Sequence, residues 1–280
     1  MIRSLRYVVP ALVAALTLAG CSGSDDPRPK ADTPASTASS APPTPKQSVP
    51  TVGECYRLDF DAATKPTSTE AAVPCTQPHT AQTVFVGTLD TVDDGHLLAV
   101  DSSEVQQQLA ATCPTKLPAW LGGDQDTLRL SRFQSIWFSP SITDADAGAT
   151  WYRCDVVAVQ GQAALADLPA RTKGVLGGEG VLDTFGTCGN VSPASKKFQR
   201  TICSQPHGWQ AVSVFEIPPD ATYLGKQPYA DADDACKLEA QQRASDPLVY
   251  RWSVEWPTQD EWNAGRRYSL CWVPAKGPKP

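Results

Sequence analysis

The side chains with the clearest potential for chemistry in this sequence are its nine cysteines and three histidines. Thiols and imidazoles can bind a metal, form disulfides, or act as nucleophiles and bases. The sequence has no Cys-x-x-Cys pair, which is a usual spacing in zinc sites, so we expect no metal. It also has no glycine loop of the kind that cradles phosphates, and we expect no cofactor.

Cys21 differs from the other cysteines because it ends a recognisable leader. Two arginines make a basic start, residues 7–18 are almost wholly apolar, and Leu-Ala-Gly directly precedes the cysteine. This order is typical of a secretory signal, and the apolar run is shorter than the roughly 20 residues that span a bilayer. The tetrad resembles the bacterial lipobox. This resemblance implies that Cys21 becomes the acylated first residue of a lipoprotein, with fatty acyl chains such as palmitate, whereas the alternative is an ordinary signal with a chance cysteine.

The charge of the chain limits the partners that it can have. Without residues 1–20 it keeps 22 basic and 30 acidic residues, a net charge of −8. This negative net charge argues against binding to nucleic acid and against electrostatic binding to anionic lipid. We therefore expect the lipid anchor alone to hold the protein at the extracytoplasmic face of the cell membrane.

The remaining eight cysteines form an even set, which predicts four disulfides in an exported chain. Sequence alone leaves many connectivities open. The eight residues are Cys55, Cys75, Cys113, Cys154, Cys188, Cys203, Cys236 and Cys271.

The histidines are the sharpest candidates for catalysis or ligand binding. His79 and His207 each follow a Gln-Pro pair and lie four residues after a cysteine. Each could act as a base or, with a neighbouring glutamine, as a ligand. A turn histidine that hydrogen-bonds nearby backbone explains the same pattern, and we favour this structural role. His96 lies in an Asp-Asp-Gly-His loop and is expected to be exposed.

No known hydrolase motif accompanies these residues. The sequence has no Gly-x-Ser-x-Gly elbow and no His-Glu-x-x-His pair, and eight paired cysteines would leave no free nucleophilic thiol. We therefore expect a protein that is not an enzyme.

The elements that must position these residues come in two copies. Residues 73–82 align with 201–210, and both copies keep the intervals between a later proline, glycine and cysteine. We assign 1–20 to the signal peptide, 21–50 to a proline-rich stalk, 51–160 to the first copy, 161–182 to a linker, 183–275 to the second copy and 276–280 to a tail. The stalk lacks aromatic residues and is expected to be disordered, with a reach of roughly 90 Å.

Each copy is predicted to have an α+β fold, in which an antiparallel sheet of about four strands carries one packed helix. We expect strands at 83–87, 151–159, 211–215 and 249–256, because apolar residues alternate or cluster there. A helix is expected over 101–111, with Asp101 as its N-cap and Glu104 completing a capping box. Tyr229, Ala232 and Cys236 have helical spacing in the second copy.

In each set of four cysteines, the third falls on the predicted helix and the fourth on the last strand. A bond between these two would fix the helix to the sheet, and a bond between the first and second would close the opening loop. We therefore predict the pairs Cys55–Cys75, Cys113–Cys154, Cys188–Cys203 and Cys236–Cys271.

Both copies resemble the septum formation-related domain of actinobacterial envelope proteins. The family pattern opens with Gly-x-Cys, continues with Val-Pro-Cys-x-x-x-His-x-x-Glu, and ends with Pro, Trp-x-x-Gly-x-Arg and a last cysteine. Gln82 and Gln210 stand at the Glu position. The second copy keeps the ending at Pro257, Trp262, Gly265, Arg266 and Cys271, whereas the first has Ala145 and Ala149 in place of Trp and Arg. The resemblance implies an extracytoplasmic envelope module linked to septum formation, with no established reaction.

Tryptophans are the other candidates for binding. Trp252 and Trp256 alternate along a strand and are expected to be core, whereas Trp262 is the aromatic most expected to be exposed, with Arg266 on the same surface. We expect a membrane-anchored interaction module whose partner is an envelope protein or cell-wall component. The alternative is a cell-wall glycan or peptide binder, with or without hydrolytic activity.

Overall fold

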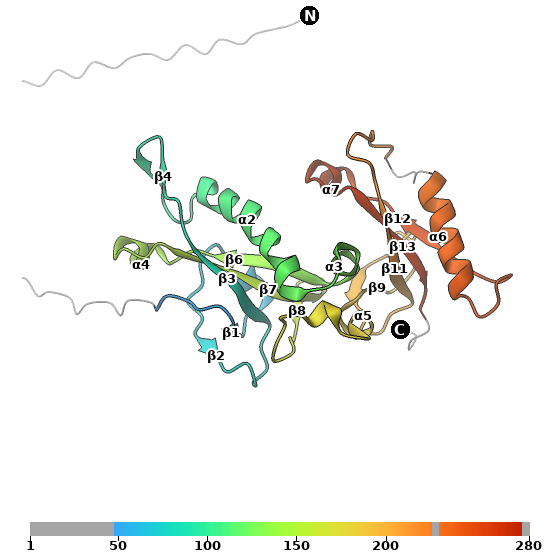
Figure 1. Ribbon diagram of the computed structural model, residues 1–280, viewed down its shortest axis with the longest axis horizontal. Helices are drawn as coiled ribbons and strands as arrows, with labels where there is room; N and C mark the ends of the chain where they lie inside the picture. The colour runs from blue at the N-terminus through green and yellow to red at the C-terminus, as the bar shows by residue number, and fades with distance from the viewer. Residues whose placement is uncertain (1–47, 226–229, 276–280) are drawn as a thin grey trace, which may run out of the picture. The chain divides into compact units, whose positions relative to one another are not determined.

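A computed structural model of the chain describes residues 48–225 and 230–275 (Figure 1). Cys21, the predicted signal peptide, most of the predicted stalk and Tyr229 lie outside the described residues. Within these residues, no helix combines the length and apolar character that a membrane span requires.

The first domain is built on an antiparallel sheet with the strand order β2-β1-β3-β7-β6. Short β8 pairs with the end of β7. Helix α2 packs on the sheet against β3, β6 and β7, and a small β4–β5 hairpin precedes it. The strands are β1 (Cys55–Tyr56), β2 (Ala72–Val73), β3 (Ala81–Thr88), β4 (Val92–Asp93), β5 (His96–Leu97), β6 (Phe133–Phe138), β7 (Trp151–Gly161) and β8 (Ala164–Ala166). The helices are α1 (Phe60–Ala63), α2 (Ser103–Leu121), α3 (Gln125–Leu130) and α4 (Ile142–Asp146).

The second domain repeats this plan with the order β10-β9-β11-β13-β12 and one packed helix, α6. Both domains interrupt the register of their central strand pair at the same place, between Thr83 and Phe85 and between Ala211 and Ser213. The tandem α+β architecture is therefore confirmed, with more strands than the four expected. Its elements are β9 (Thr187–Gly189), β10 (Arg200–Ile202), β11 (Trp209–Glu216), α6 (Ala230–Arg243), β12 (Ser253–Glu255), α7 (Gln259–Asn263) and β13 (Tyr268–Pro274).

Helix α2 differs from its prediction at both ends. Ser102, not Asp101, is the N-cap, and its hydroxyl accepts a hydrogen bond from the Val105 amide. The helix runs ten residues past Ala111, through Pro114 and Pro118. Its buried side chains recur every four residues as far as Leu121, so packing on the sheet offsets the cost of the two prolines.

The predicted strand 249–256 is shorter than expected, because only β12, near its C-terminal end, pairs with β13. Trp256 is buried as predicted, whereas Trp252 is half-buried. The Trp252 indole nitrogen donates a hydrogen bond to Asp233 of α6, so this polar group has a partner at the edge of the sheet.

The four disulfides join the pairs that the order of the cysteines predicted: Cys55–Cys75, Cys113–Cys154, Cys188–Cys203 and Cys236–Cys271. In each domain one bond joins the packed helix to the last long strand, and the other joins the first strand to the turn that follows the second strand.

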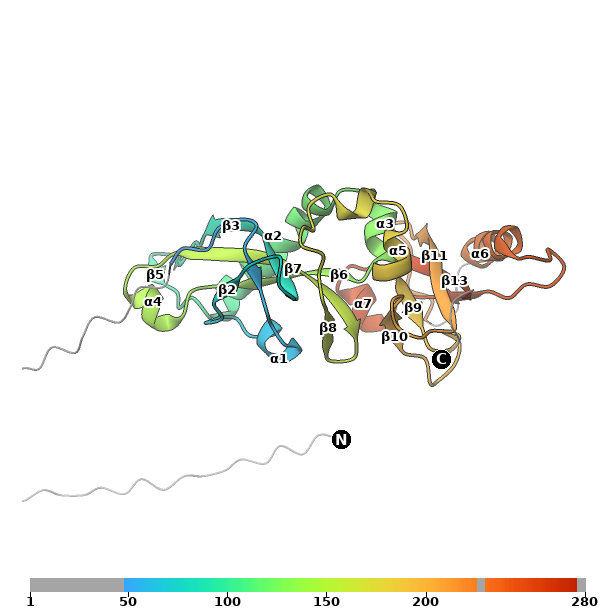
Figure 2. The same ribbon diagram turned by 90° about the horizontal axis from the view of Figure 1, so that it is seen from below.

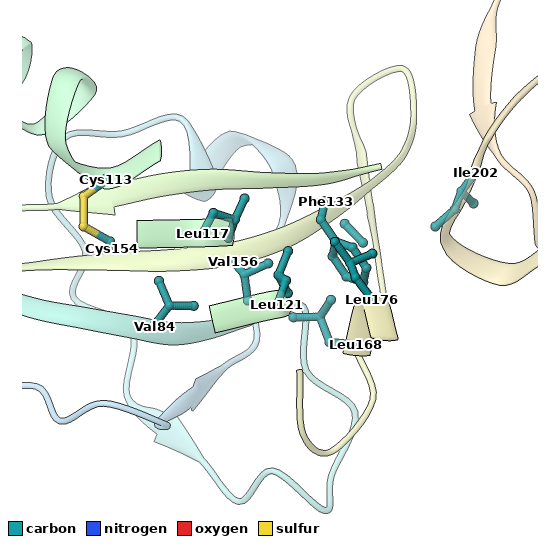
Figure 3. Close-up of a cluster of buried hydrophobic side chains, with 11 residues drawn as sticks. Val84, Cys113, Leu117, Leu121, Phe133, Cys154, Val156, Leu168, Leu176 and Ile202 are labelled. Carbon is teal, nitrogen blue, oxygen red and sulfur yellow. A yellow bond between two sulfur atoms is a disulfide. The ribbon is translucent and has the colours of Figure 1, made fainter. Parts of the chain in front are cut away.

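The segment assigned to a linker packs against the first domain. Its Leu168 and Leu176 are buried in the same cluster as Leu121 and Val156 (Figure 3). The segment also forms β8, a short 3-10 helix at Val175–Gly177 and the start of helix α5 (Val181–Phe185), which Figure 2 shows beside β9. Leucines at these positions gain more by joining the core than by remaining in solvent.

Each domain also contributes a side chain to the core of the other. Ile202 of β10 is fully buried in the cluster of the first domain. Leu130 of α3 is buried among Ala211, Leu270 and Trp272 of the second. A hydrogen bond of 3.0 Å from the Thr201 hydroxyl to the Gln160 carbonyl supports this contact.

Candidate binding cleft between the two domains

The two candidate histidines are both buried, and each bonds to its own turn. The Nδ1 atom of His79 lies 2.9 Å from the Gln77 carbonyl, and that of His207 lies 2.7 Å from the Gln205 carbonyl. This geometry fits the structural role that we favoured. His96 is exposed on the β4–β5 hairpin, as expected.

Gln82, at the family's Glu position, also has a structural role. Its buried amide accepts a 2.9 Å hydrogen bond from the backbone amide of Thr172 and donates at 3.2 Å to the Gly53 carbonyl. It thereby joins the connecting segment to the opening loop of the first domain.

Trp262 is not exposed, and this prediction was wrong. The residue is 8% exposed and packs with Ile217, Ala232 and Trp256. Thr258 and Glu261 form a capping box that starts the short helix α7, which includes Trp262. A single helical turn that packs on the core buries the indole, whereas an extended loop would have left it free.

Arg266 does not share a surface with Trp262 either. Counted from Gly265, the arginine of the Trp-x-x-Gly-x-Arg pattern is Arg267, and its guanidinium lies 4.1 Å from the centre of the Trp262 ring. Arg266 instead donates to Glu261 at 2.7 Å and lies over the Tyr268 ring at 4.7 Å.

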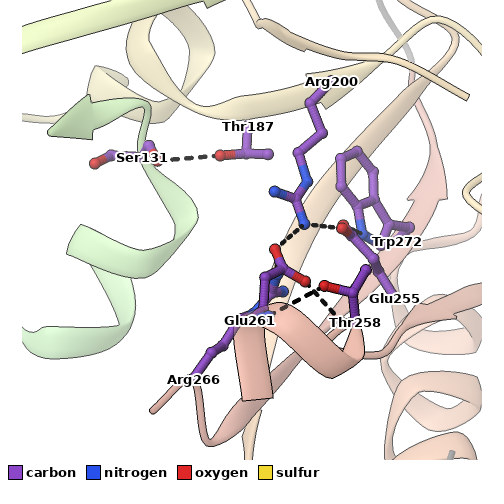
Figure 4. A network of polar contacts seen from close by, with 8 residues as sticks. All are labelled: Ser131, Thr187, Arg200, Glu255, Thr258, Glu261, Arg266 and Trp272. Carbon is purple, nitrogen blue, oxygen red and sulfur yellow. Dashed lines mark hydrogen bonds and ion pairs between the residues drawn. The ribbon is translucent and has the colours of Figure 1, made fainter. Parts of the chain in front are cut away.

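Glu261 is the centre of a charged network in the second domain (Figure 4). Besides Arg266, it pairs with Arg200 at 3.4 Å, and Arg200 also binds Glu255. The other Glu255 oxygen accepts from the Trp272 indole at 2.9 Å. Burial opposes ionisation of Glu261, but the Thr258 amide and the two arginines outweigh it and keep the pKa of Glu261 below its usual value.

The first domain lacks this network. At the matching positions it has Ala72 for Arg200, Phe138 for Glu255 and Ala149 for Arg266. The charged network therefore distinguishes the second domain from the first.

The first domain instead has a buried ion pair between Arg153 and Asp155, 3.2 Å apart. The Arg153 guanidinium lies 3.5 Å from the centre of the Tyr56 ring, and Asp155 accepts from the Thr83 hydroxyl at 2.8 Å. Burial raises the pKa of Asp155 against the opposing effect of Arg153. Both charges are closed off from solvent, so the pair belongs to the core.

The network borders a cleft of about 720 Å³ between the two domains. Its walls come from α2, α3 and β6 of the first domain and from β9, β10 and β13 of the second. Five arginines line it and no acidic side chain does. They are Arg129, Arg132, Arg200, Arg266 and Arg267.

These arginines repel one another. Burial, together with the nearby charge of Arg200, lowers the pKa of Arg132 to about 10. Burial and the charge of Arg266 likewise lower the pKa of Arg200. Such an arrangement favours a negative charge inside the cleft.

The sequence pointed to only one of the five arginines, Arg266. The five come from three segments of the chain, 129–132, 200 and 266–267, and nothing in the sequence indicates that the fold brings these segments together. Only the Thr258-x-x-Glu261 capping box carried a local signal that could have been recognised. Among the described residues, no group of three or more histidines, cysteines or acidic residues is placed to hold a metal.

Comparison with known proteins supports the resemblance found in the sequence. The family described as septum formation matches twice, at residues 27–139 and 127–271. No curated protein and no solved structure matched the chain. The two matches together cover most of the sequence, and the chain belongs to the septum formation family.

Proposed function

We propose that this protein is a lipid-anchored, non-enzymatic interaction module that acts in septum formation on the outer face of the cell membrane. The observation that carries the proposal is the family match, which occurs twice along the chain. Acylation of Cys21 supplies the anchor, and the proline-rich stalk separates the folded domains from the bilayer.

The disulfide content of the two domains supports an extracytoplasmic location. Four disulfides close small sheets, as is common in exported proteins that fold in an oxidising compartment. The two domains share core residues, so both walls of the cleft are held by packed elements. A binding surface on such a scaffold is organised before its partner arrives.

A second candidate function is the binding of a cell-wall component, and the size of the cleft favours it. Its volume of about 720 Å³ lies within the roughly 300–1,000 Å³ of typical small-molecule sites. In this case the partner is a wall polymer or its precursor, and the anchor has the same role.

Localisation in the native bacterium tests the first proposal. The tagged wild-type protein should fractionate with the membrane and concentrate at septa. Cys21→Ser should move it to the soluble extracytoplasmic fraction, whereas the neighbouring change Ser22→Ala should not. Even distribution of the wild type around the cell would contradict the septal role.

Crosslinking separates the two candidates. Capture of one septal protein from crosslinked membranes supports the hypothesis of a protein partner, whereas retention on purified cell wall supports the hypothesis of wall binding. If the interaction uses the cleft, Arg132→Glu should abolish it. Arg171 is exposed and does not line the cleft, so Arg171→Glu is the matched control and should leave the interaction unchanged.

A further inference from the structure

The cleft is strongly cationic although the whole protein is acidic. The full chain carries a net charge of −6, yet the five charged side chains that line this cavity are all arginines. Asp126, Glu216, Glu255 and Glu261 pair with three of these arginines and neutralise part of this charge, but none of them is a lining residue. A ligand in the cavity therefore meets guanidinium groups and no carboxylate.

Two of these arginines have no acidic partner within the described part of the chain. Arg132 donates one hydrogen bond, from Nε to the Val159 carbonyl at 3.0 Å, and no described residue bonds its two terminal nitrogens. Arg267 bonds only backbone carbonyls and stacks on Trp262. Arg266 differs from these two, because its Nη1 atom donates to Glu261 and its Nε and Nη2 atoms are buried away from solvent. Arg132 and Arg267 both line the cleft, so an anion there can accept hydrogen bonds from donors that no described carboxylate uses.

These donors indicate the charge of the ligand that would suit the cleft. A carboxylate supplies one negative charge, whereas a phosphate monoester carries about −1.5 to −2 at neutral pH and offers three acceptor oxygens. Two guanidinium groups without an acidic partner, Arg132 and Arg267, match the phosphate better. Arginine also binds phosphate oxygens in a bidentate manner.

The rest of the cavity is neutral. Leu117, Leu128 and Phe133 give it an apolar wall, and Gln134 and Thr187 add uncharged polar groups. The volume of about 720 Å³ is far more than a phosphate needs. The cavity thus suits a phosphate joined to a larger group.

We propose that the cleft between the domains is a phosphate-binding site, in which Arg132 and Arg267 hold the phosphate of an envelope molecule. This inference rests on the proposed function, since it names the ligand class of the same cleft. A phospholipid headgroup and a phosphate-bearing wall polymer share the chemistry, and the test distinguishes these two sources.

The test uses the secreted full chain with Cys21→Ser, titrated calorimetrically with glycerol 3-phosphate at constant ionic strength. We expect saturable binding, with sodium acetate giving none. Arg132→Gln should weaken binding at least about tenfold, because it removes a charge-assisted contact. Arg171→Gln makes the same charge change outside the cleft and should leave the affinity within about twofold.

A second variant tests the site independently, in case Arg132→Gln does not fold. Gln134 is exposed and lines the cleft, so Gln134→Glu adds a negative charge there without disturbing the core. It should also weaken phosphate binding, with an unchanged circular dichroism spectrum. Absence of binding by the parent protein, or equal affinity in Gln134→Glu and Arg171→Gln, would overturn the proposal.

Two further binding measurements identify the source of the phosphate. Vesicles of phosphatidylglycerol present a headgroup, and soluble poly(glycerol phosphate) presents a polymer. Binding of either one that is lost in Arg132→Gln identifies that source, and binding of neither would overturn the proposal. These measurements are independent of localisation, so a protein that binds phosphate but avoids septa would contradict only the proposed function.

Discussion

The guanidinium of Arg267 stacks on the indole of Trp262, 4.1 Å from the ring centre, and closes the solvent side of a buried cluster. Its Nη1 atom also donates to the Trp262 carbonyl at 2.5 Å. The two residues of the family's Trp-x-x-Gly-x-Arg pattern therefore hold each other in the fold. In the first domain the same positions are Ala145 and Thr150, and the contact does not form.

Trp262→Ala should destabilise the protein rather than only weaken binding. The residue is buried with Ile217 and Trp256, and truncation of such an aromatic costs about 3–5 kcal/mol. Urea unfolding followed by circular dichroism measures this loss. Leu248→Ala, at a residue that is 89% exposed, is the control and should change the free energy of unfolding by less than about 0.5 kcal/mol. Equal stability of the two variants would show that Trp262 is not part of the core.

The disulfides should contribute unequally to stability. Cys113–Cys154 closes a separation of 41 residues and Cys188–Cys203 one of 15. In the chain-entropy treatment the longer loop is worth about 0.9 kcal/mol more. Paired Cys→Ala variants of each bond, compared by urea unfolding, check this order. The reverse order would mean that packing around the sulfur atoms outweighs loop entropy.

Glu261→Gln should remove a pH-dependent part of the stability. The pKa of Glu261 is lowered in the folded state, so its ionised form stabilises the fold above the unfolded pKa, and this effect is lost as the pH falls through the folded pKa. The variant should be about 1–3 kcal/mol less stable at pH 7, with the difference shrinking below about pH 4. Unfolding curves between pH 7 and pH 3 measure it. Glu70→Gln, at an exposed side chain, should show no such difference, and a gap for Glu261→Gln that stays constant with pH would contradict the ion-pair explanation.

Ile202→Ala should destabilise both domains together. The side chain belongs to the second domain but lies fully buried in the core of the first. Removing it should cost about 2–5 kcal/mol and lower the melting temperature of a single calorimetric transition. Ile142→Ala, at a residue that is 56% exposed, should leave the transition unchanged. Two separate transitions in the wild-type protein would show that the domains unfold independently.

Local patterns predicted the parts of the fold that depend on local chemistry. Matching intervals between cysteines, a proline and a glycine revealed the duplication, and the place of each cysteine on a helix or strand indicated all four disulfides. The extent of α2 and the exposure of Trp262 were predicted wrongly. Both depend on packing against the sheet, which overrides the helix-breaking tendency of Pro114 and Pro118 and turns the indole inward.

The sequence by itself therefore determined the repeated α+β domains, the disulfide framework and the family resemblance, because these follow from periodicity and from the spacing of a few residue types. Only the tertiary structure decided which residues line the cleft. The lining arginines come from three distant segments, 129–132, 200 and 266–267, and they line one cleft because each domain inserts a side chain, Ile202 or Leu130, into the core of the other. Contacts between residues so far apart in sequence follow from packing free energy, which no local pattern encodes.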